Sequence, residues 1–129
     1  MAIAYWCIFI SAMLPYLWIG IGKSATRGYD NRDPRDWVAK QSHPRVIRGN
    51  AAHLNAFEAF APFAAAVLMA QAAGVDPGRI STLAVVFIAA RILHGVFYLS
   101  NTHLLRSLAW VVGIGCVAML MVQAAIQAG

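Results

Sequence analysis

The sequence predicts an all-α membrane protein, a bundle of four transmembrane helices, and three observations support this. Of the 129 residues, 60% are hydrophobic and 12% are charged, whereas soluble domains carry ~25% charged residues. The sequence contains four apolar runs that are each long enough to cross a membrane as a helix, since about 20 helical residues span ~30 Å of hydrocarbon. Seven of the ten Lys and Arg residues lie in one segment, residues 23–48. A small water-soluble domain covers most of its surface with polar groups, so this composition excludes one.

The first apolar run spans residues 3–22 and contains Pro15, which membrane helices tolerate as a kink. This run is too long for the apolar part of a signal peptide and has no cationic segment before it, so we expect it to persist as a helix. Residues 23–48 follow, and their Asp, Asn and Pro content together with their mixed charge predict a loop. A helical turn is predicted within it, around residues 37–40.

Three further runs complete the bundle, at residues 50–73, 80–99 and 105–125. The turn signal Gly74-Val-Asp-Pro-Gly78 separates the first two of them, and a short polar connector at residues 100–103 separates the last two. We therefore predict a single membrane domain over residues 1–129.

The basic residues predict how the bundle lies in the membrane. The first connection holds seven Lys and Arg residues, the second holds Arg79 and the third holds Arg106. Because cytoplasmic loops are rich in Lys and Arg, we expect loop 23–48 in the cytoplasm and both termini on the non-cytoplasmic side. The same clustering argues against nucleic acid as a partner, despite the net charge of +5.

Ionisable side chains inside the apolar runs are the main functional signal, because they are costly at membrane depth. Asn55 and Glu58 are three residues apart and share a helix face, as do Arg91, His94 and Tyr98 in the next run. Glu58 and Arg91 each lie about 12 Å from the cytoplasmic end of their run at ~1.5 Å per residue. The two faces either form a charge-paired pocket, or Glu58 and Arg91 simply neutralise each other and stabilise the bundle.

Other polar residues also allow two interpretations. His53 and Tyr98 are either ligand contacts or residues solvated and anchored near the membrane interface. The basic loop either only orients the protein or forms, with Arg106, a cationic mouth above the pocket. Arg106 opens a helix whose N-terminus favours anions, so an anionic peptide-like ligand would suit it. Cys7 and Cys116 are expected to be buried apolar residues, and no metal site is predicted.

Three segments resemble one family. Arg48-Gly-Asn-Ala-Ala-His-Leu-Asn55-Ala-Phe-Glu58-Ala-Phe-Ala-Pro-Phe63 is similar to the signature of the MAPEG proteins, membrane-associated proteins in eicosanoid and glutathione metabolism. Arg91-Ile-Leu-His-Gly-Val-Phe-Tyr98 resembles the pattern of the family's third helix, and Arg106-Ser-Leu-Ala-Trp110 the start of its fourth. The three occur in the family's order, and the chain looks like a bacterial-type member related to microsomal glutathione transferases.

The resemblance implies a homotrimer that binds glutathione as co-substrate between neighbouring subunits, near the cytoplasmic face and among membrane lipids, with a lipophilic small molecule as second substrate. It implies that Arg106 stabilises the glutathione thiolate with help from Ser107. The residues that it implies for holding glutathione are Arg48, His53, Asn55, Glu58, Arg91, His94 and Tyr98.

The sequence departs from the family pattern at two positions. Some members carry an Arg at the position of Ala51 and an aromatic residue at the position of Ala59. Three functions therefore stay open. They are a glutathione transferase or peroxidase-like enzyme, a non-catalytic membrane module that binds a lipid or partner protein with a degenerate pocket, and a small transporter that uses Glu58, Arg91 and His94.

Overall fold

The computed structural model describes residues 1–129 as five helices and no strands, and it confirms the all-α fold class. The helices are α1 (Ala2–Lys23), α2 (Pro34–Ala39), α3 (Pro44–Ala72), α4 (Pro77–Leu99) and α5 (His103–Ala128). All except α2 are long and apolar enough to cross a membrane. The chain is therefore an integral membrane protein with four candidate spans.

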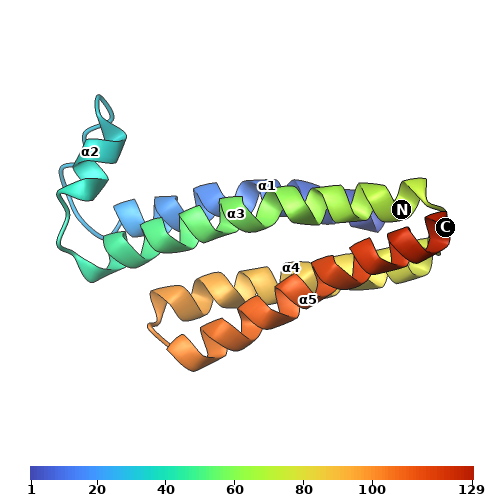
Figure 1. The fold of residues 1–129 in the computed structure, drawn as a ribbon. Helices are drawn as coiled ribbons and strands as arrows, with labels where there is room; N and C mark the ends of the chain where they lie inside the picture. The colour runs from blue at the N-terminus through green and yellow to red at the C-terminus, as the bar shows by residue number, and fades with distance from the viewer.

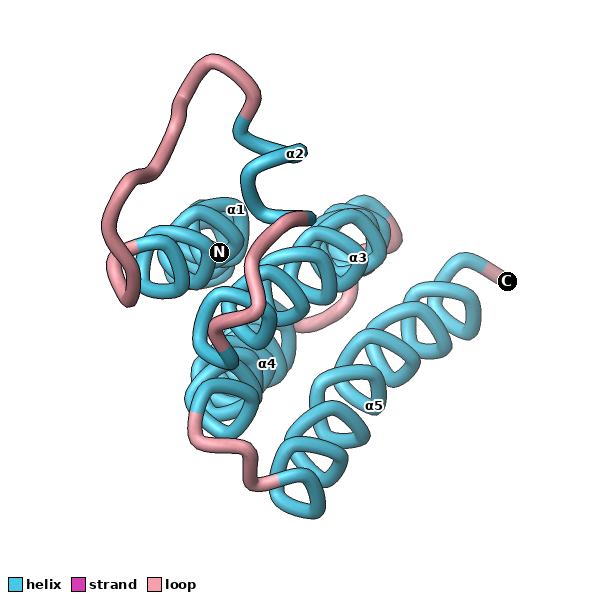
Figure 2. The backbone as a smooth tube through the Cα atoms, turned by 90° about the vertical axis from the view of Figure 1, so that its left-hand side faces the viewer, coloured by secondary structure: helices cyan, strands magenta, loops and turns pink.

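The long helices run antiparallel to their neighbours in sequence (Figure 1). Both termini and the α3–α4 turn lie at one end of the bundle, whereas α2 and the α4–α5 connection lie at the other. Viewed from the α2 end, α1 and α3 lie above α4, and α5 lies to the right, where it packs against both α3 and α4 (Figure 2). The bundle is thus asymmetric along its length, with all of its basic loop at one end.

Three helices begin at a proline that follows a polar capping residue, and the caps define where each helix starts. Asp33 accepts a hydrogen bond from the backbone N–H of Asp36, and Asp76 accepts one from that of Arg79. Proline is favoured at the first position of a helix because its missing N–H would have no partner there. All three of these helices begin earlier than the sequence predicted, and α4 begins at Pro77 rather than at residue 80.

The larger correction concerns α3, which begins at Pro44 and not at residue 50. Residues 44–48 were assigned to the loop because Arg45 and Arg48 are charged, yet they are helical. The Nδ1 atom of His43 accepts a hydrogen bond from the N–H of Arg45 at 3.2 Å, which caps the helix. The helical turn expected near residues 37–40 is α2, which starts three residues earlier, and α5 extends the run 105–125 at both ends.

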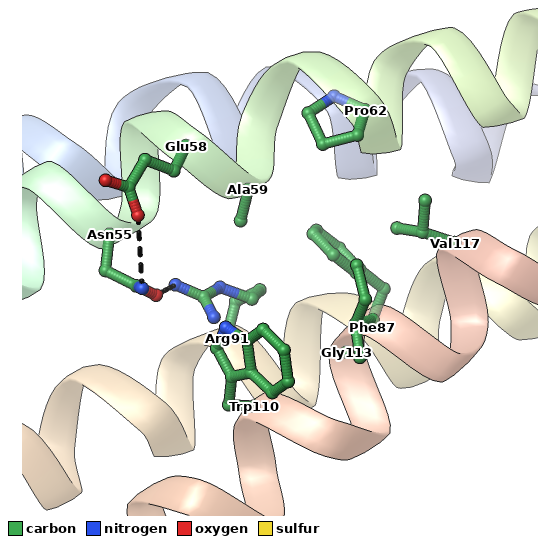
Figure 3. Close-up of a pocket in the computed structure, with 10 residues that line it drawn as sticks. Asn55, Glu58, Ala59, Pro62, Phe87, Arg91, Trp110, Gly113 and Val117 are labelled. Carbon is green, nitrogen blue, oxygen red and sulfur yellow. Dashed lines mark hydrogen bonds between the residues drawn. The ribbon is translucent and has the colours of Figure 1, made fainter.

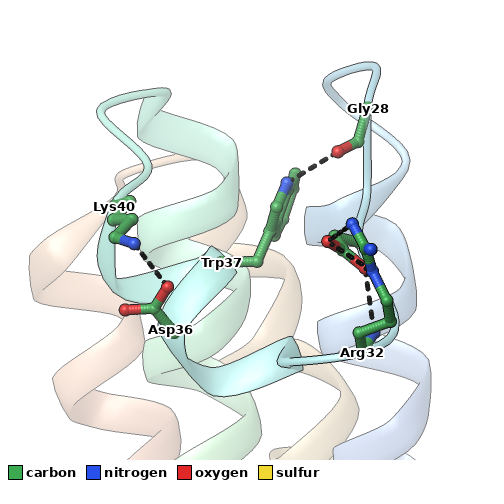
Figure 4. A network of polar contacts seen from close by, with 6 residues as sticks. Gly28, Arg32, Asp36, Trp37 and Lys40 are labelled. Atoms are coloured by element: carbon green, nitrogen blue, oxygen red, sulfur yellow. Dashed lines mark hydrogen bonds and ion pairs between the residues drawn. The ribbon is translucent and has the colours of Figure 1, made fainter.

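The connection between α1 and α3 is ordered by aromatic and charged contacts around α2 (Figure 4). Trp37 donates a hydrogen bond from Nε1 to the carbonyl of Gly28 at 2.9 Å, and the ring of Tyr29 meets the Trp37 ring edge to face. Lys40 pairs with Asp36, and Arg32 pairs with Asp30. The Arg32 guanidinium holds the pKa of the Asp30 carboxyl below its usual range by hydrogen bonding.

The main hydrophobic core lies in the half of the bundle that contains the termini. It is built from α1, α3, α4 and α5, with Phe63, Ile80, Phe87 and Leu120 among its fully buried side chains. A smaller cluster of Leu14, Trp18, Ala52 and Ala56 lies nearer the loop end. Packing is therefore densest away from the loop, and the polar residues gather in the half near the loop.

Candidate functional site

Asn55 is the centre of the polar cluster between α3 and α4. Its Oδ1 accepts a hydrogen bond from Nη2 of Arg91 at 2.7 Å, and its Nδ2 lies 3.5 Å from the Glu58 carboxylate (Figure 3). Glu58 and Arg91 form no ion pair within 4.0 Å. The two charges predicted to face each other are thus joined through an amide, and they do not neutralise each other directly.

Arg91 and Glu58 differ sharply in exposure. The Arg91 side chain is buried, with 3% of its surface exposed, whereas Glu58 lies on the exposed surface of the protomer. Burying a charge requires hydrogen-bond partners, and Asn55 supplies one to Arg91. The carboxylate of Glu58 remains available to a ligand or to a neighbouring chain.

A cavity of about 150 Å³, which we call the inner cavity, lies beside this cluster between α3, α4 and α5. Asn55, Glu58 and Arg91 form its polar side. Its remaining lining residues are small, apolar or aromatic: Ala59, Pro62, Phe87, Trp110, Gly113, Ile114 and Val117. The inner cavity therefore has one charged side and one apolar side.

A second cavity, the outer cavity, has a volume of about 230 Å³ and is lined by Asn55, His94, Tyr98, Arg106, Ser107, Trp110 and Val111. Asn55 and Trp110 line both cavities, so the two adjoin. The outer cavity brings together the predicted residues from α4 with those from the start of α5.

Tyr98 links the α4 and α5 residues of the outer cavity. The guanidinium carbon of Arg106 lies 4.4 Å from the centre of the Tyr98 ring, and the His94 ring meets Tyr98 edge to face at 5.4 Å. A cation over an aromatic face is held electrostatically, which orients the Arg106 side chain. Arg106 is the fourth residue of α5 rather than its first, and its N–H donates to the carbonyl of Thr102, so it lies just after the N–H groups without helical partners that favour anions.

The charges of the two cavities favour an anionic ligand. Arg91 and Arg106 contribute two guanidinium groups and Glu58 contributes one carboxylate. A ligand that carries carboxylates and an amino group would find partners of both signs here. The arrangement is also suited to stabilising a thiolate beside Arg106, since a nearby cation favours the ionised thiol.

Two predicted site residues lie outside both cavities. The Nδ1 atom of His53 lies 2.8 Å from the carbonyl oxygen of Pro15, so this nitrogen carries the proton and donates to α1. The His53 ring also contacts Tyr16 and Phe57 edge to face. Arg48 is half-buried near the start of α3 and lines neither cavity.

Sequence reasoning did not identify the apolar lining of the inner cavity. Phe87 is four residues before Arg91, and Trp110 is four residues after Arg106, so each lies on the same helix face as a predicted site residue. Gly113, three residues after Trp110, and Val117, four residues after Gly113, continue the same face of α5. Their helical spacing from Arg91 and Arg106 is the signal that could have identified these lining residues.

Comparison with known proteins gives one match. The model of the MAPEG family matches residues 3–126. No curated protein and no solved structure matches the chain.

Proposed function

The chain belongs to the MAPEG family, which includes glutathione transferases and related proteins, and on this premise we propose that it is a membrane-bound glutathione transferase or peroxidase-like enzyme acting on lipophilic electrophiles. The observation that carries the proposal is the outer cavity, where Arg106, Ser107, Tyr98 and His94 converge next to Asn55. A catalyst of this kind needs an anion site for the tripeptide, a cation for its sulfur and access from lipid.

In the proposed reaction, Arg106 stabilises the thiolate that forms when the glutathione thiol loses its proton to water. The sulfur attacks the electrophilic carbon of an aryl halide, a carbon–sulfur bond forms, and the carbon–halogen bond breaks with release of halide. Lowering the pKa of a thiol increases the fraction of nucleophilic thiolate near neutral pH. Ser107, in the next position of the same helix turn, donates a hydrogen bond from its hydroxyl to the same sulfur and keeps its proton.

Glutathione is held in this proposal by residues of both charges. Glu58 binds its amino group, Arg91 and Asn55 bind its carboxylate or amide groups, and His94 and Tyr98 contact the peptide. His53 and Arg48 lie outside the cavities of the protomer and have no part in this set.

We place the site at a subunit seam of a homotrimer, on the cytoplasmic side of a bacterial inner membrane. Glu58 supports this, because a carboxylate exposed on the protomer at membrane depth is costly unless a partner covers it. The loop from Ser24 to His43 and the α4–α5 connection lie at the same end of the bundle, which agrees with a shared cytoplasmic side.

The deciding experiment is conjugation of glutathione to chlorodinitrobenzene by purified protein in detergent, with Arg106→Ala and Glu58→Ala as variants. We expect turnover by the wild type, loss of turnover in Arg106→Ala, and weaker glutathione binding in Glu58→Ala. Millimolar glutathione should raise the melting temperature, because a ligand of the native state stabilises it.

If the protein shows no turnover and glutathione does not stabilise it, the enzyme proposal is rejected. The non-catalytic membrane module with a degenerate pocket is then favoured. Unchanged turnover in Arg106→Ala would reject only the role of Arg106. Crosslinking in the membrane tests the trimer separately. A monomer that retains full activity would show that the site does not need a neighbouring subunit.

A further inference from the structure

The inner cavity is too small for the proposed tripeptide. Its volume is about 150 Å³, whereas pockets for drug-sized ligands have volumes of roughly 300–1,000 Å³. An engineered apolar cavity of about 150 Å³ in another protein binds benzene. The inner cavity therefore matches a single ring in size.

The walls of the inner cavity are suited to an aromatic ring. Phe87 is stacked on Phe63 with ring centres 3.8 Å apart and planes 8° apart, and Phe63 is fully buried. This stacking fixes the Phe87 ring as a rigid wall. Trp110, Ile114 and Val117 supply the wall on α5, and aromatic pairs favour such offset or edge-to-face contacts.

Two small residues keep this space open. Ala59 lies on the α3 side of the inner cavity, and Gly113 lies on the α5 side. A Cβ atom added at Gly113 would lie 3.5 Å from Cδ of Arg91 and 3.9 Å from the Phe87 ring, which is ordinary contact distance. A larger side chain at either position would reduce the volume of the inner cavity, and Gly113→Ala would add one methyl group there without a clash.

The polar side of the inner cavity provides donors. Arg91 uses one of its N–H groups on Asn55 and has others left, since guanidinium carries five. A hydrogen-bond acceptor on the ring, such as a carbonyl or nitro group, would meet these donors. The inner cavity adjoins the outer cavity through Asn55 and Trp110, so a ring held there lies next to the site proposed for the thiolate.

We propose that the inner cavity is a binding subsite for one six-membered aromatic ring that carries a hydrogen-bond acceptor, and that Ala59 and Gly113 set its size. The assignment of this ring to the electrophile rests on the proposed function. The binding of the ring does not require glutathione and can be measured without it.

The test is fluorine NMR of the full protein in lipid nanodiscs, without glutathione, with fluorobenzene, meta-fluoroacetophenone and fluoronaphthalene as probes. We expect saturable binding of the two monocyclic probes, tighter for the acetophenone, and only lipid partitioning for the bicyclic probe. Ala59→Phe should weaken monocyclic binding by about tenfold or more, because one methylene in an apolar pocket already changes recognition by roughly 10–200-fold.

Ala61→Phe is the matched control, since Ala61 is exposed on the same helix and lines neither cavity. It should bind the probes as the wild type does. If Ala59→Phe does not fold, Gly113→Ala replaces it and should also weaken binding. Equal probe signals in wild type, in the filled variants and in empty nanodiscs would overturn the proposal, as would equal affinity for the bicyclic probe.

The outcomes separate this proposal from the proposed function. Probe binding that Ala59→Phe abolishes supports the ring subsite even if glutathione neither stabilises the protein nor turns over. Stabilisation by glutathione without saturable probe binding rejects the ring subsite and leaves the transferase proposal in place. If both hold, Ala59→Phe should raise the KM for chlorodinitrobenzene by a larger factor than it weakens glutathione binding, because Ala59 lines the inner cavity beside the polar residues proposed to hold glutathione.

Discussion

Asn55 accepts a hydrogen bond from the buried guanidinium of Arg91 at 2.7 Å, and this contact joins α3 to α4 at the candidate site. The amide of Asn55 lies between the two charges, because its nitrogen faces Glu58 at 3.5 Å. Arg91 is thereby held inside the bundle, while Glu58 stays exposed on the protomer. Asn55 thus holds the buried guanidinium of Arg91 in place and keeps it apart from the exposed carboxylate of Glu58.

The first prediction concerns this contact. Asn55→Ala should destabilise the fold, because it removes an acceptor from a buried charge. Side-chain hydrogen bonds between membrane helices average about 0.6 kcal/mol and reach about 1.7 kcal/mol, and charged donors give stronger bonds. We expect a coupling energy of about 1.5 kcal/mol in a double-mutant cycle of Asn55→Ala and Arg91→Ala, measured by unfolding in mixed micelles.

Asn55→Asp is the control for this cycle, since it keeps an oxygen acceptor for Arg91. It should retain most of the stability that Asn55→Ala loses. Additive effects of the two alanine substitutions would show that the hydrogen bond contributes nothing.

The second prediction concerns the close approach of α1 and α4. The indole of Trp18 lies over Gly95, and a Cβ atom at Gly95 would overlap its ring. Gly95→Ala should therefore lower the free energy of unfolding by about 1–3 kcal/mol, as overpacking does. Gly115→Ala is the matched control, because an added Cβ there meets nothing within 4 Å. The control should be neutral or stabilising, since alanine favours helix over glycine; equal melting temperatures for the two variants would contradict the packing.

The third prediction separates His53 from the ligand site. His53→Ala removes the hydrogen bond to the Pro15 carbonyl and should cost about 1 kcal/mol of stability. It should leave the stabilisation by millimolar glutathione unchanged, whereas Glu58→Ala should reduce it. Thermal unfolding with and without glutathione gives both quantities. If His53→Ala lowers the glutathione affinity without a loss of stability, His53 contacts the ligand and the prediction is wrong.

The position of His53 shows what the sequence alone could have decided. His53 precedes Asn55 by two residues, which places the two side chains on different faces of a helix. Helix spacing grouped only Asn55 with Glu58, and the family resemblance added His53 to the ligand residues. The spacing of Asn55 and Glu58, and that of Arg91, His94 and Tyr98, did predict which residues line the cavities.

The apolar wall of the inner cavity was not predictable in the same way. Phe87, Gly113 and Val117 are apolar residues within apolar runs, so composition does not distinguish a cavity wall from a lipid-facing or core position. Ala59 stood out only as a departure from the family pattern, and the structure shows that it lines the inner cavity. The fold class could be predicted from hydropathy and charge. The start of α3 could not, because it depends on the cap at His43, and the charged residues that follow His43 suggested a loop.

The fourth prediction concerns pH and the loop around α2. Hydrogen bonds from Arg32 lower the pKa of Asp30 in the folded protein. The ion pair is therefore fully present above the unfolded value of about 3.9 and is lost as pH falls through the lower folded value. In Arg32→Gln the pKa of Asp30 should rise toward its ordinary range, measured by carbon NMR in micelles, while the hydrogen bond from the backbone N–H of residue 32 still lowers it. Lys40→Gln should leave it unchanged, since Lys40 pairs with Asp36. A pKa of Asp30 that does not respond to Arg32→Gln would exclude the pairing.

The fifth prediction tests whether Tyr98 positions Arg106 for catalysis. The guanidinium lies over the Tyr98 ring at 4.4 Å, so the ring and not the hydroxyl orients it. Under the proposed function, Tyr98→Phe should keep the ultraviolet absorbance of bound thiolate and most of kcat. Tyr98→Leu should raise the pKa of the bound thiol and lower kcat, because a mobile cation stabilises the thiolate less well.

Arg106→Lys distinguishes charge from geometry at this position. A lysine keeps the positive charge and can also lie over an aromatic ring, but its ammonium is a flexible point charge without the planar fork. We expect a thiol pKa between those of the wild type and Arg106→Ala. If Tyr98→Leu and Tyr98→Phe give the same pH–rate profile as the wild type, the ring does not position Arg106, and the first turn of α5 alone must orient the guanidinium.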